Sequence, residues 1–288
     1  MPPRSHYLNC GNFNVHFTAW GNPTAPAVIA WHGLARTGRD FDTLAQRLSS
    51  RYHVICPDTI GRGLSQWSQH PKDDYCLATY ASHALALMDG LGLSQAHWVG
   101  TSMGGNIGMV CAAALALPAF RGRLRSLLLN DIAPEISSSA VERIKAYAGQ
   151  PPAFDTVPEL EAFFRQVYAP FGLSTDEEWQ HLTENSLRRL PDGRVTPHYD
   201  PQLVQQFFRA SPEFDMWVQY DALDLPVFVM RGANSDLVAP ETIAAMHTRG
   251  PGARGLLRSE VIDGCGHAPA LNTAAQIQSV VDFLQSCD

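Results

Sequence analysis

The chain has 288 residues, 45% of them hydrophobic and 17% charged, and its 21 Lys and Arg against 28 Asp and Glu leave a net charge of −7. This balance is typical of a compact globular chain and excludes an intrinsically disordered one. The length accommodates one large domain with an inserted lid. Because an acidic chain does not attract polyanions, we expect neither nucleic acid nor a membrane surface as a partner.

Targeting and metal-binding signals are weak. The opening residues, MPPRSHYLNC, contain no apolar stretch that would indicate a secretory signal. The longest apolar stretch, residues 107–120, is shorter than the about 20 residues that a transmembrane helix needs, and predicts a buried helix. The six cysteines show no metal-ligand spacing. We therefore expect reduced thiols in a cytoplasmic protein and no bound metal.

Short apolar runs bounded by turn residues recur along the chain. Such runs are typical of buried parallel strands, and helical patterns separate several of them. An alternating segment around Gly11-Asn12 predicts a hairpin ahead of the first run. The sequence therefore predicts an α/β fold, with a mostly parallel central sheet flanked by helices. The predicted elements are the hairpin at 6–20, strands at 27–31, 52–56, 96–100, 124–129, 226–230 and 259–262, and a helix at 79–91.

The pattern changes between residues 131 and 221, where no strand-like run occurs. Helix starts are indicated by Ser139 and by two capping boxes, Thr156 with Glu159 and Ser174 with Glu177. We therefore expect a core domain made of residues 1–131 and 222–288. Residues 132–221 are expected to form a helical cap inserted after the sixth strand.

The strongest local motif is Gly100-Thr101-Ser102-Met103-Gly104. It follows an apolar strand and precedes a helical stretch of small residues, 105–117, which is the context that a GxSxG nucleophile elbow requires. A serine on so sharp a turn needs small neighbours, because bulky ones would collide with the strand and the helix. The helix N-terminus also offers oriented N–H groups for a developing oxyanion. Ser102 is therefore the candidate nucleophile.

Three landmarks in order resemble the α/β-hydrolase superfamily, in its capped esterase- or lactonase-like branch. They are His32-Gly33-Leu34, which resembles the oxyanion loop; Asp58-x-x-Gly61-x-Gly63-x-Ser65, which resembles the turn after the fourth strand; and Thr101-Ser102-Met103-Gly104-Gly105, which resembles the elbow. The resemblance covers residues 25–130 and 222–288 and is weaker in the cap.

A serine nucleophile needs a base and an acid that orients it. His267, in a glycine-containing loop after the last strand, is the expected base, whereas His32 resembles the structural histidine of the oxyanion loop. Asp236 follows the strand at 226–230, and the family's chain order of nucleophile, acid and histidine favours it as the acid. Asp131 is the rival, because it also ends a strand.

The resemblance also implies the oxyanion hole. Its donors would be the backbone N–H groups of Met103, which follows the nucleophile, and of Leu34, which follows His-Gly. Asp58 is expected to form a turn rather than to take part in catalysis.

A serine nucleophile without a cofactor motif predicts acyl transfer to water. The substrate would be an ester of small to medium size, a lactone or a hydroxyacid oligomer. One alternative is a carbon–carbon hydrolase of a vinylogous diketone, but residues 34–38, LARTG, depart from the small-residue loop of those enzymes. A second is an acyltransferase with the same triad. A third, a non-catalytic receptor, would have lost a member of the triad.

No motif in the sequence marks the residues that contact the substrate. Arg36, Arg39 and Arg231 are candidates for binding a substrate carboxylate, although a lone arginine is more often structural. Most aromatic residues of the cap would pack against the core, and a minority would line the pocket. The residues expected to contact the substrate are Arg36, Tyr147, Tyr168 and Trp217.

Overall fold

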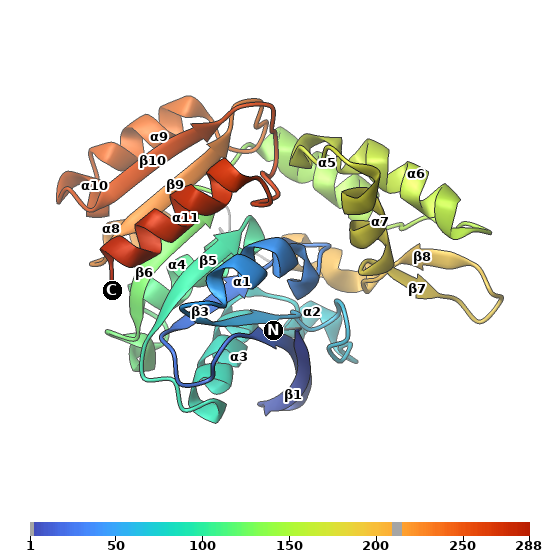
Figure 1. The fold of residues 1–288 in the computed structure, drawn as a ribbon, viewed down its shortest axis with the longest axis horizontal. Helices are drawn as coiled ribbons and strands as arrows, with labels where there is room; N and C mark the ends of the chain where they lie inside the picture. Colours follow the sequence, from blue (N-terminus) through green and yellow to red (C-terminus); the bar gives the residue numbers. More distant parts are fainter. Residues whose placement is uncertain (1–2, 209–214) are drawn as a thin grey trace.

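Eight strands form one sheet in the computed structural model, which describes residues 3–208 and 215–288 (Figure 1). Their order across the sheet is β1-β2-β4-β3-β5-β6-β9-β10. The pairs β1–β2 and β2–β4 are antiparallel, and the other neighbours are parallel. The predicted α/β fold and the opening hairpin are confirmed. The strands are β1 Arg4–Cys10, β2 Phe13–Trp20, β3 Ala27–Trp31, β4 His53–Pro57, β5 Ala96–Thr101, β6 Leu124–Asn130, β9 Val227–Gly232 and β10 Leu257–Ile262.

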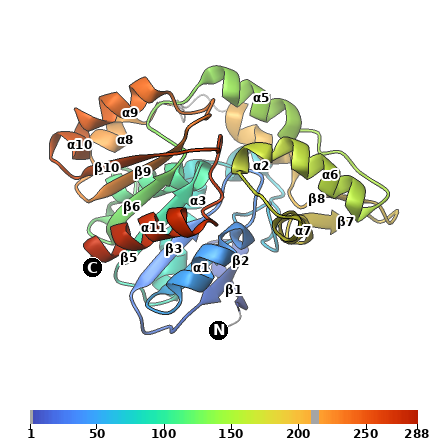
Figure 2. The ribbon, with the colours of Figure 1, turned by 45° about the horizontal axis from the view of Figure 1, so that its top comes forward.

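Helices cover both faces of this sheet. Figure 2 shows α1 (Asp42–Leu48) and α11 (Ala274–Ser286) over one face, where Val28 and Ala30 of β3 join their core cluster. On the other face, Ile29 and Trp31 pack with α3 and α4. Alternate residues of a strand point to opposite faces, so a strand buried on both sides is apolar throughout. The remaining core helices are η1 Gly38–Phe41, α2 Pro71–Asp74, α3 Leu77–Gly90, α4 Met103–Ala113, η2 Pro118–Phe120, α9 Pro240–His247 and α10 Gly250–Ala253.

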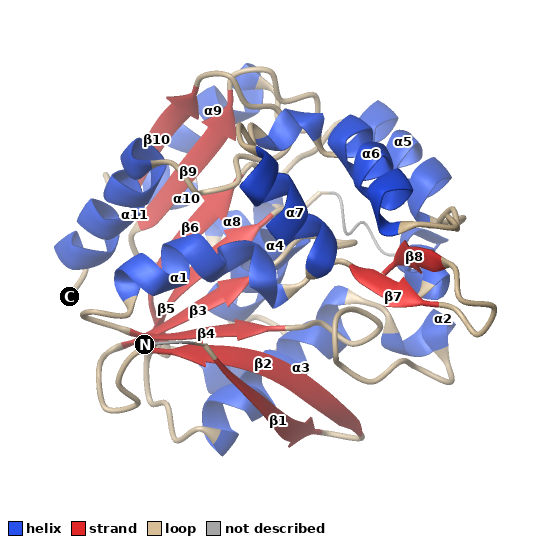
Figure 3. Ribbon diagram, turned by 45° about the vertical axis from the view of Figure 1, so that its right-hand side comes forward, coloured by secondary structure: helices blue, strands red, loops and turns tan. Residues whose placement is uncertain are grey.

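Residues 132–221, hereafter the inserted segment, leave the sheet after β6 and return before β9 (Figure 3). Part of the segment has a small core of its own, which includes Leu160, Phe164 and Trp179. Its last helix, α8, packs instead against α4 of the main core. The elements are α5 Ser138–Ala148, α6 Val157–Val167, η3 Ala169–Phe171, α7 Asp176–Glu184, β7 Leu187–Arg189, β8 Val195–Pro197, η4 Pro201–Phe208 and α8 Trp217–Asp221.

Three local expectations need correction. The inserted segment is not free of strands, because β7 and β8 pair as a two-stranded antiparallel sheet. The capping box of α7 is formed by Thr175 and Glu178, one residue after the predicted pair, whereas the box of Thr156 and Glu159 is confirmed. Helix α4 ends at Ala113, earlier than residue 117, because Ala114 adopts a left-handed conformation with φ of 51°.

No helix among residues 3–208 and 215–288 combines the length and the apolar character needed to cross a membrane. All six cysteines are free, and five of them are buried.

Candidate active site

The turn between β5 and α4 holds Ser102 in a strained backbone conformation, with φ of 52° and ψ of −120°. The residues two positions before and two positions after it must be glycines. A Cβ on Gly104 would lie 2.0 Å from the carbonyl oxygen of Trp31, and one on Gly100 would lie 2.4 Å from the amide nitrogen of Gly105. The backbone thus turns sharply at the carboxyl end of a central strand, and this turn places the serine at the start of a helix.

His267 connects the serine to a buried carboxylate. It lies in the loop between β10 and α11, with Nε2 2.9 Å from Ser102 Oγ and Nδ1 2.8 Å from Asp131 Oδ2. Gly266 N donates to Pro170 O at 2.8 Å, and Ala270 N donates to Phe171 O at 3.1 Å. The histidine loop is therefore held on both sides by the inserted segment.

The carboxylate beside the histidine belongs to Asp131 and not to Asp236, the acid expected from the sequence. Asp131 is fully buried, and its carboxylate also accepts hydrogen bonds from Gly232 N at 2.8 Å and from the Ser235 hydroxyl at 2.6 Å. Asp236 is instead exposed and pairs with Arg143 at 2.6 Å. The rival carboxylate of the sequence analysis therefore occupies the place beside His267.

The neighbouring positions of β6 and β9 explain why the sequence offers two candidates for the acid. The two strands are parallel and adjacent, so an acid after either strand reaches the same edge of the sheet. Asp131 follows the last residue of β6 directly and has φ of 50°, which turns it towards the histidine. The chain after β9 continues through Ala233, Asn234 and Ser235 before it reaches Asp236. Asp131 follows its strand directly, and this position in the sequence was the signal that favoured it as the partner of His267.

The expected oxyanion donors lie beside the serine. Met103 is the first residue of α4, and both Met103 and Leu34 share a cavity lining with Ser102. Neither backbone N–H makes a hydrogen bond within the described part of the chain. Both amides thus remain available to an oxygen at this point.

His32 fixes the loop that carries Leu34. Its Nδ1 donates to Gly33 O at 2.6 Å, and its Nε2 accepts from Thr59 N at 2.9 Å. Burial lowers the pKa of His32 to about 4, which keeps the ring neutral and preserves this tautomer. The structural role that the resemblance implied for His32 agrees with this arrangement.

Arg62, which occupies the unassigned position between Gly61 and Gly63, contacts both of the residues that are expected to donate to an oxyanion. The guanidinium is fully buried; its Nε donates to Leu34 O at 2.8 Å, and its Nη2 lies 3.7 Å from Met103 Sδ. The rings of Tyr75 and Tyr80 flank it, with centroids 5.4 and 5.3 Å from Cζ. Its position in the motif between Gly61 and Gly63 gave no signal for these contacts.

Asp58 has the turn-forming role that was expected. Its carboxylate accepts from Gly38 N at 2.7 Å, from Leu64 N at 2.9 Å and from His16 Nδ1 at 2.7 Å. Burial would raise the pKa of Asp58, but the hydrogen bond and charge of His16 bring it below the ordinary value. Asp58 therefore holds together the segments below the oxyanion loop.

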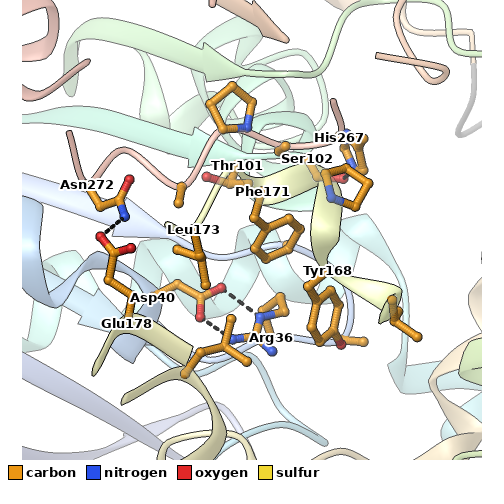
Figure 4. A pocket seen from close by; sticks show the side chains of 18 of the residues that line it. Arg36, Asp40, Thr101, Ser102, Tyr168, Phe171, Leu173, Glu178, His267 and Asn272 are labelled. Atoms are coloured by element: carbon orange, nitrogen blue, oxygen red, sulfur yellow. Dashed lines mark hydrogen bonds and ion pairs between the residues drawn. The ribbon is translucent and has the colours of Figure 1, made fainter. Parts of the chain in front are cut away.

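Ser102 lines two cavities of very different size. The larger, of about 530 Å³, lies between the core and the inserted segment and also contains Arg36 and Tyr168. Figure 4 shows Arg36 with Asp40 on one side of this cavity and Ser102 with His267 on the other. The smaller cavity, of about 50 Å³, shares Leu34, Ser102 and Ile144 with the larger one.

Arg36 is buried in the larger cavity with part of its guanidinium unused. Its Nε and Nη2 donate to the two oxygens of Asp40 at 2.9 and 2.5 Å, and the Tyr168 ring centroid lies 4.6 Å from Cζ. Its Nη1 has no hydrogen-bond partner within the described residues. Burial alone would lower the pKa of Arg36, but the Asp40 carboxylate raises it above the ordinary value, so the group is always charged.

The other predicted substrate contacts differ in their outcome. Tyr168 lines the larger cavity, but Trp217 lines neither, because α8 packs on α4 and the indole lies against Arg249, 4.2 Å from centroid to Cζ. Tyr147 lies on α5, but its side chain is not among those that the structure describes. Arg231 binds backbone carbonyls, including Val238 O at 2.7 Å, so it is structural.

Arg39 forms an ion pair with Asp42 at 2.5 Å at the margin of the larger cavity. In the part of the chain that the structure describes, no group of three or more His, Cys, Asp or Glu side chains is arranged to hold a metal ion.

Comparisons with known proteins give the family and the fold of the chain. The model of the family described as "alpha/beta hydrolase fold" matches residues 26–272. A 3-hydroxybutyrate-oligomer hydrolase of Cupriavidus necator is 40% identical over 98% of this chain and 97% of that protein. An α/β hydrolase structure from Novosphingobium aromaticivorans has a TM-score of 0.85 at 31% identity, covering 98% of each chain. The structure of a hydrolase from Rickettsia typhi has a TM-score of 0.89 at 24% identity, covers 100% of each chain and shares the fold.

Proposed function

The chain belongs to the α/β-hydrolase fold family, and we propose that it cleaves a carboxylic ester through an acyl-enzyme on Ser102. The observation that carries this proposal is the pair of contacts made by His267, 2.9 Å to Ser102 Oγ and 2.8 Å to Asp131 Oδ2. A histidine between a serine hydroxyl and a buried carboxylate is the arrangement that activates a serine nucleophile. In this proposal Asp131, and not Asp236, is the acid of the triad.

The reaction follows from these positions. His267 Nε2 accepts the proton of Ser102 as Oγ attacks the ester carbonyl, and Asp131 stabilises the resulting imidazolium. The N–H groups of Met103 and Leu34 donate to the oxyanion that forms. His267 then gives its proton to the departing alcohol, which leaves the acyl group on Ser102. Water, deprotonated by the same histidine, releases the acid and restores the enzyme.

The substrate that we propose is a short hydroxyacid oligomer. The relative at 40% identity is named for hydrolysing 3-hydroxybutyrate oligomers, and it matches this chain over nearly all of its length. Such a substrate ends in a carboxylate, and the buried Arg36 offers its unpartnered Nη1 to one. The cavity of about 530 Å³ has room for several ester units.

The inserted segment, residues 132–221, acts in this proposal as the cap of the site, and the remaining residues form the core domain. Its residues Tyr168, Phe171 and Leu173 line the larger cavity opposite the loops of the core. We place the reaction in the cytoplasm, which is supported by the six free cysteines.

The test of this function compares classes of reaction. Purified protein should hydrolyse p-nitrophenyl butyrate and the 3-hydroxybutyrate dimer without added metal or cofactor. Ser102→Ala should remove essentially all turnover and also labelling by a fluorophosphonate, because both need the serine oxygen. Circular dichroism of the variant controls for folding.

Three results would contradict the proposal. Turnover retained by folded Ser102→Ala would remove the serine from the mechanism. Cleavage of a vinylogous 1,5-diketone in preference to every ester would assign the carbon–carbon hydrolase reaction instead. An added alcohol that captures the acyl group in preference to water would identify an acyltransferase.

The role of Arg36 is tested by the charge of the substrate. Arg36→Met should raise KM for the 3-hydroxybutyrate dimer by about tenfold, because a buried charge-assisted hydrogen bond is lost. The methyl ester of the same dimer has no carboxylate, and its KM should change much less. Arg51→Met, at an exposed arginine, is the control. An equal rise in KM for acid and methyl ester would show that Arg36 only supports the structure of the cavity.

A further inference from the structure

The smaller cavity lies on the other side of the nucleophile from the substrate site described above. It is bounded by side chains of α4, α5 and η4, and neither Arg36 nor His267 lines it. Because Ser102 and Leu34 line both cavities, the nucleophile and one oxyanion donor stand at their boundary. An ester bound at Ser102 has two parts that need space, the acyl chain and the alcohol. Two cavities that meet at the serine provide one place for each.

The lining of the smaller cavity is mostly aliphatic, with two amide side chains among it. Asn106 lies on α4 one turn after Ser102, and Gln206 lies in η4 of the inserted segment. Residues four apart in a helix share a face, so Asn106 stands beside the serine. Polar side chains in an apolar pocket fix the orientation of a ligand.

The Asn106 amide has no partner of its own. The residue is only 8% exposed, and its Oδ1 is buried without a hydrogen bond. Its Nδ2 also donates no hydrogen bond within residues 3–208 and 215–288. A buried amide oxygen normally accepts a hydrogen bond, and a native structure that leaves one unsatisfied calls for an explanation.

Gln206 adds a second group to the same cavity. It is also 8% exposed, and its Oε1 accepts a hydrogen bond from the Tyr80 hydroxyl at 3.3 Å. That hydrogen bond fixes the direction of the amide and leaves Nε2 available as a donor. Two amides therefore serve one small, otherwise apolar space.

We propose that the smaller cavity is the acyl subsite and that the Asn106 amide binds a hydroxyl group of the acyl chain, which makes a short 3-hydroxyacyl ester the favoured substrate. A hydroxyl both donates and accepts, so it satisfies the amide whichever way its oxygen and nitrogen are turned. The volume of about 50 Å³ limits the acyl chain to one short unit. This inference rests on the proposed ester hydrolysis and specifies its substrate.

The experiment compares two acyl groups that differ by one oxygen. The kcat/KM for p-nitrophenyl 3-hydroxybutyrate is divided by that for p-nitrophenyl butyrate, so that the shared leaving group and chain length cancel. The wild-type ratio should be about 10 to 100, the effect of one buried hydrogen bond that the second substrate cannot make. In Asn106→Leu the ratio should fall to about one, because leucine keeps the size of the side chain and removes its polar atoms.

Two further variants make the test independent of the folding of Asn106→Leu. Gln206→Leu should lower the ratio to a smaller extent. Asn9→Leu is the matched control, because Asn9 is an exposed asparagine of β1 at the edge of the sheet, and its ratio should equal that of the wild type.

Each outcome decides one question. A wild-type ratio near one, with both esters hydrolysed, would overturn the acyl subsite and leave the proposed hydrolase function intact. An unchanged high ratio in folded Asn106→Leu would assign the hydroxyl preference to another residue and also overturn the inference. If neither ester nor the dimer were hydrolysed, the proposed function itself would fail.

Discussion

At the scale of single residues, hydrogen bonds orient the buried carboxylate of Asp131 towards His267. Its two oxygens accept three hydrogen bonds, from Gly232 N, the Ser235 hydroxyl and His267 Nδ1. The first two are made by the last residue of β9 and by the loop that follows it, so they fix the carboxylate whether or not the histidine is charged. A carboxylate fixed in this way holds the imidazole in the tautomer whose Nε2 faces the serine.

This arrangement predicts unequal effects for the two acids. Asp131→Asn should lower kcat on p-nitrophenyl butyrate by about 10³- to 10⁴-fold, because the amide favours the wrong tautomer of the histidine. Asp236→Asn should change kcat by less than about threefold, since its exposed ion pair with Arg143 is screened by water. The larger loss in Asp236→Asn would restore the acid expected from the sequence.

The predictability of the site also differs from residue to residue. Ser102 and His267 lie in motifs whose glycines are needed for a sharp turn or a conformationally unrestricted loop backbone. The structure brings these two side chains together. The acid had no such marker, because two neighbouring strands each end near an aspartate. Arg62 and Asn106 could not be identified, because their importance depends on burial and on missing partners, which no local pattern encodes.

At the scale of secondary structure, helix α7 joins the inserted segment to the core beside the larger cavity. His181 of α7 lies 3.1 Å from Asp42, the first residue of α1, and Asn272 Nδ2 donates to Glu178 Oε1 at 2.6 Å. The hydrogen bond to Asp42 raises the pKa of His181 above its ordinary value of 6.5. The contact between the segment and the core therefore includes a histidine whose protonated form is stabilised by Asp42.

The direction of the pH effect follows from this raised pKa. Protonated His181 contributes stability that is fully present below the pKa of the unfolded chain and is lost as the pH rises through the folded pKa. An NMR titration should place the pKa of His181 above 6.5, and Asp42→Asn should move it back towards that value. A wild-type pKa at or below 6.5 would show that the ion pair does not form in solution.

Secondary structure was predicted best where burial is continuous. The all-apolar strands of the sheet were found because they are buried on both faces and bounded by turn residues. The strands β7 and β8 were missed because each has three residues and β8 includes Pro197, so neither makes a recognisable pattern. The capping box of α7 was displaced by one residue because Ser174 and Thr175 each precede a glutamate by three positions.

At the scale of the whole molecule, the sequence led to the α/β fold and the position of the insertion but not to how the insertion sits on the core. That position depends on contacts between distant segments, such as Gly266 N with Pro170 O and Thr37 Oγ1 with Asn185 O. The cavities arise from the same contacts. The cavities on which the proposed substrate contacts rest could therefore not be derived from the sequence.

The unequal cavities on either side of Ser102 also give the substrate a direction. An oligomer of hydroxyacids has a hydroxyl end and a carboxyl end, and the proposed contacts place the hydroxyl end beside Asn106 and the carboxyl end towards Arg36. Since the smaller cavity has room for one unit, the proposed binding mode predicts that each turnover removes a single monomer from the hydroxyl end. We therefore expect such an oligomer to shorten stepwise, with monomers accumulating from the first turnover and without mid-chain scission.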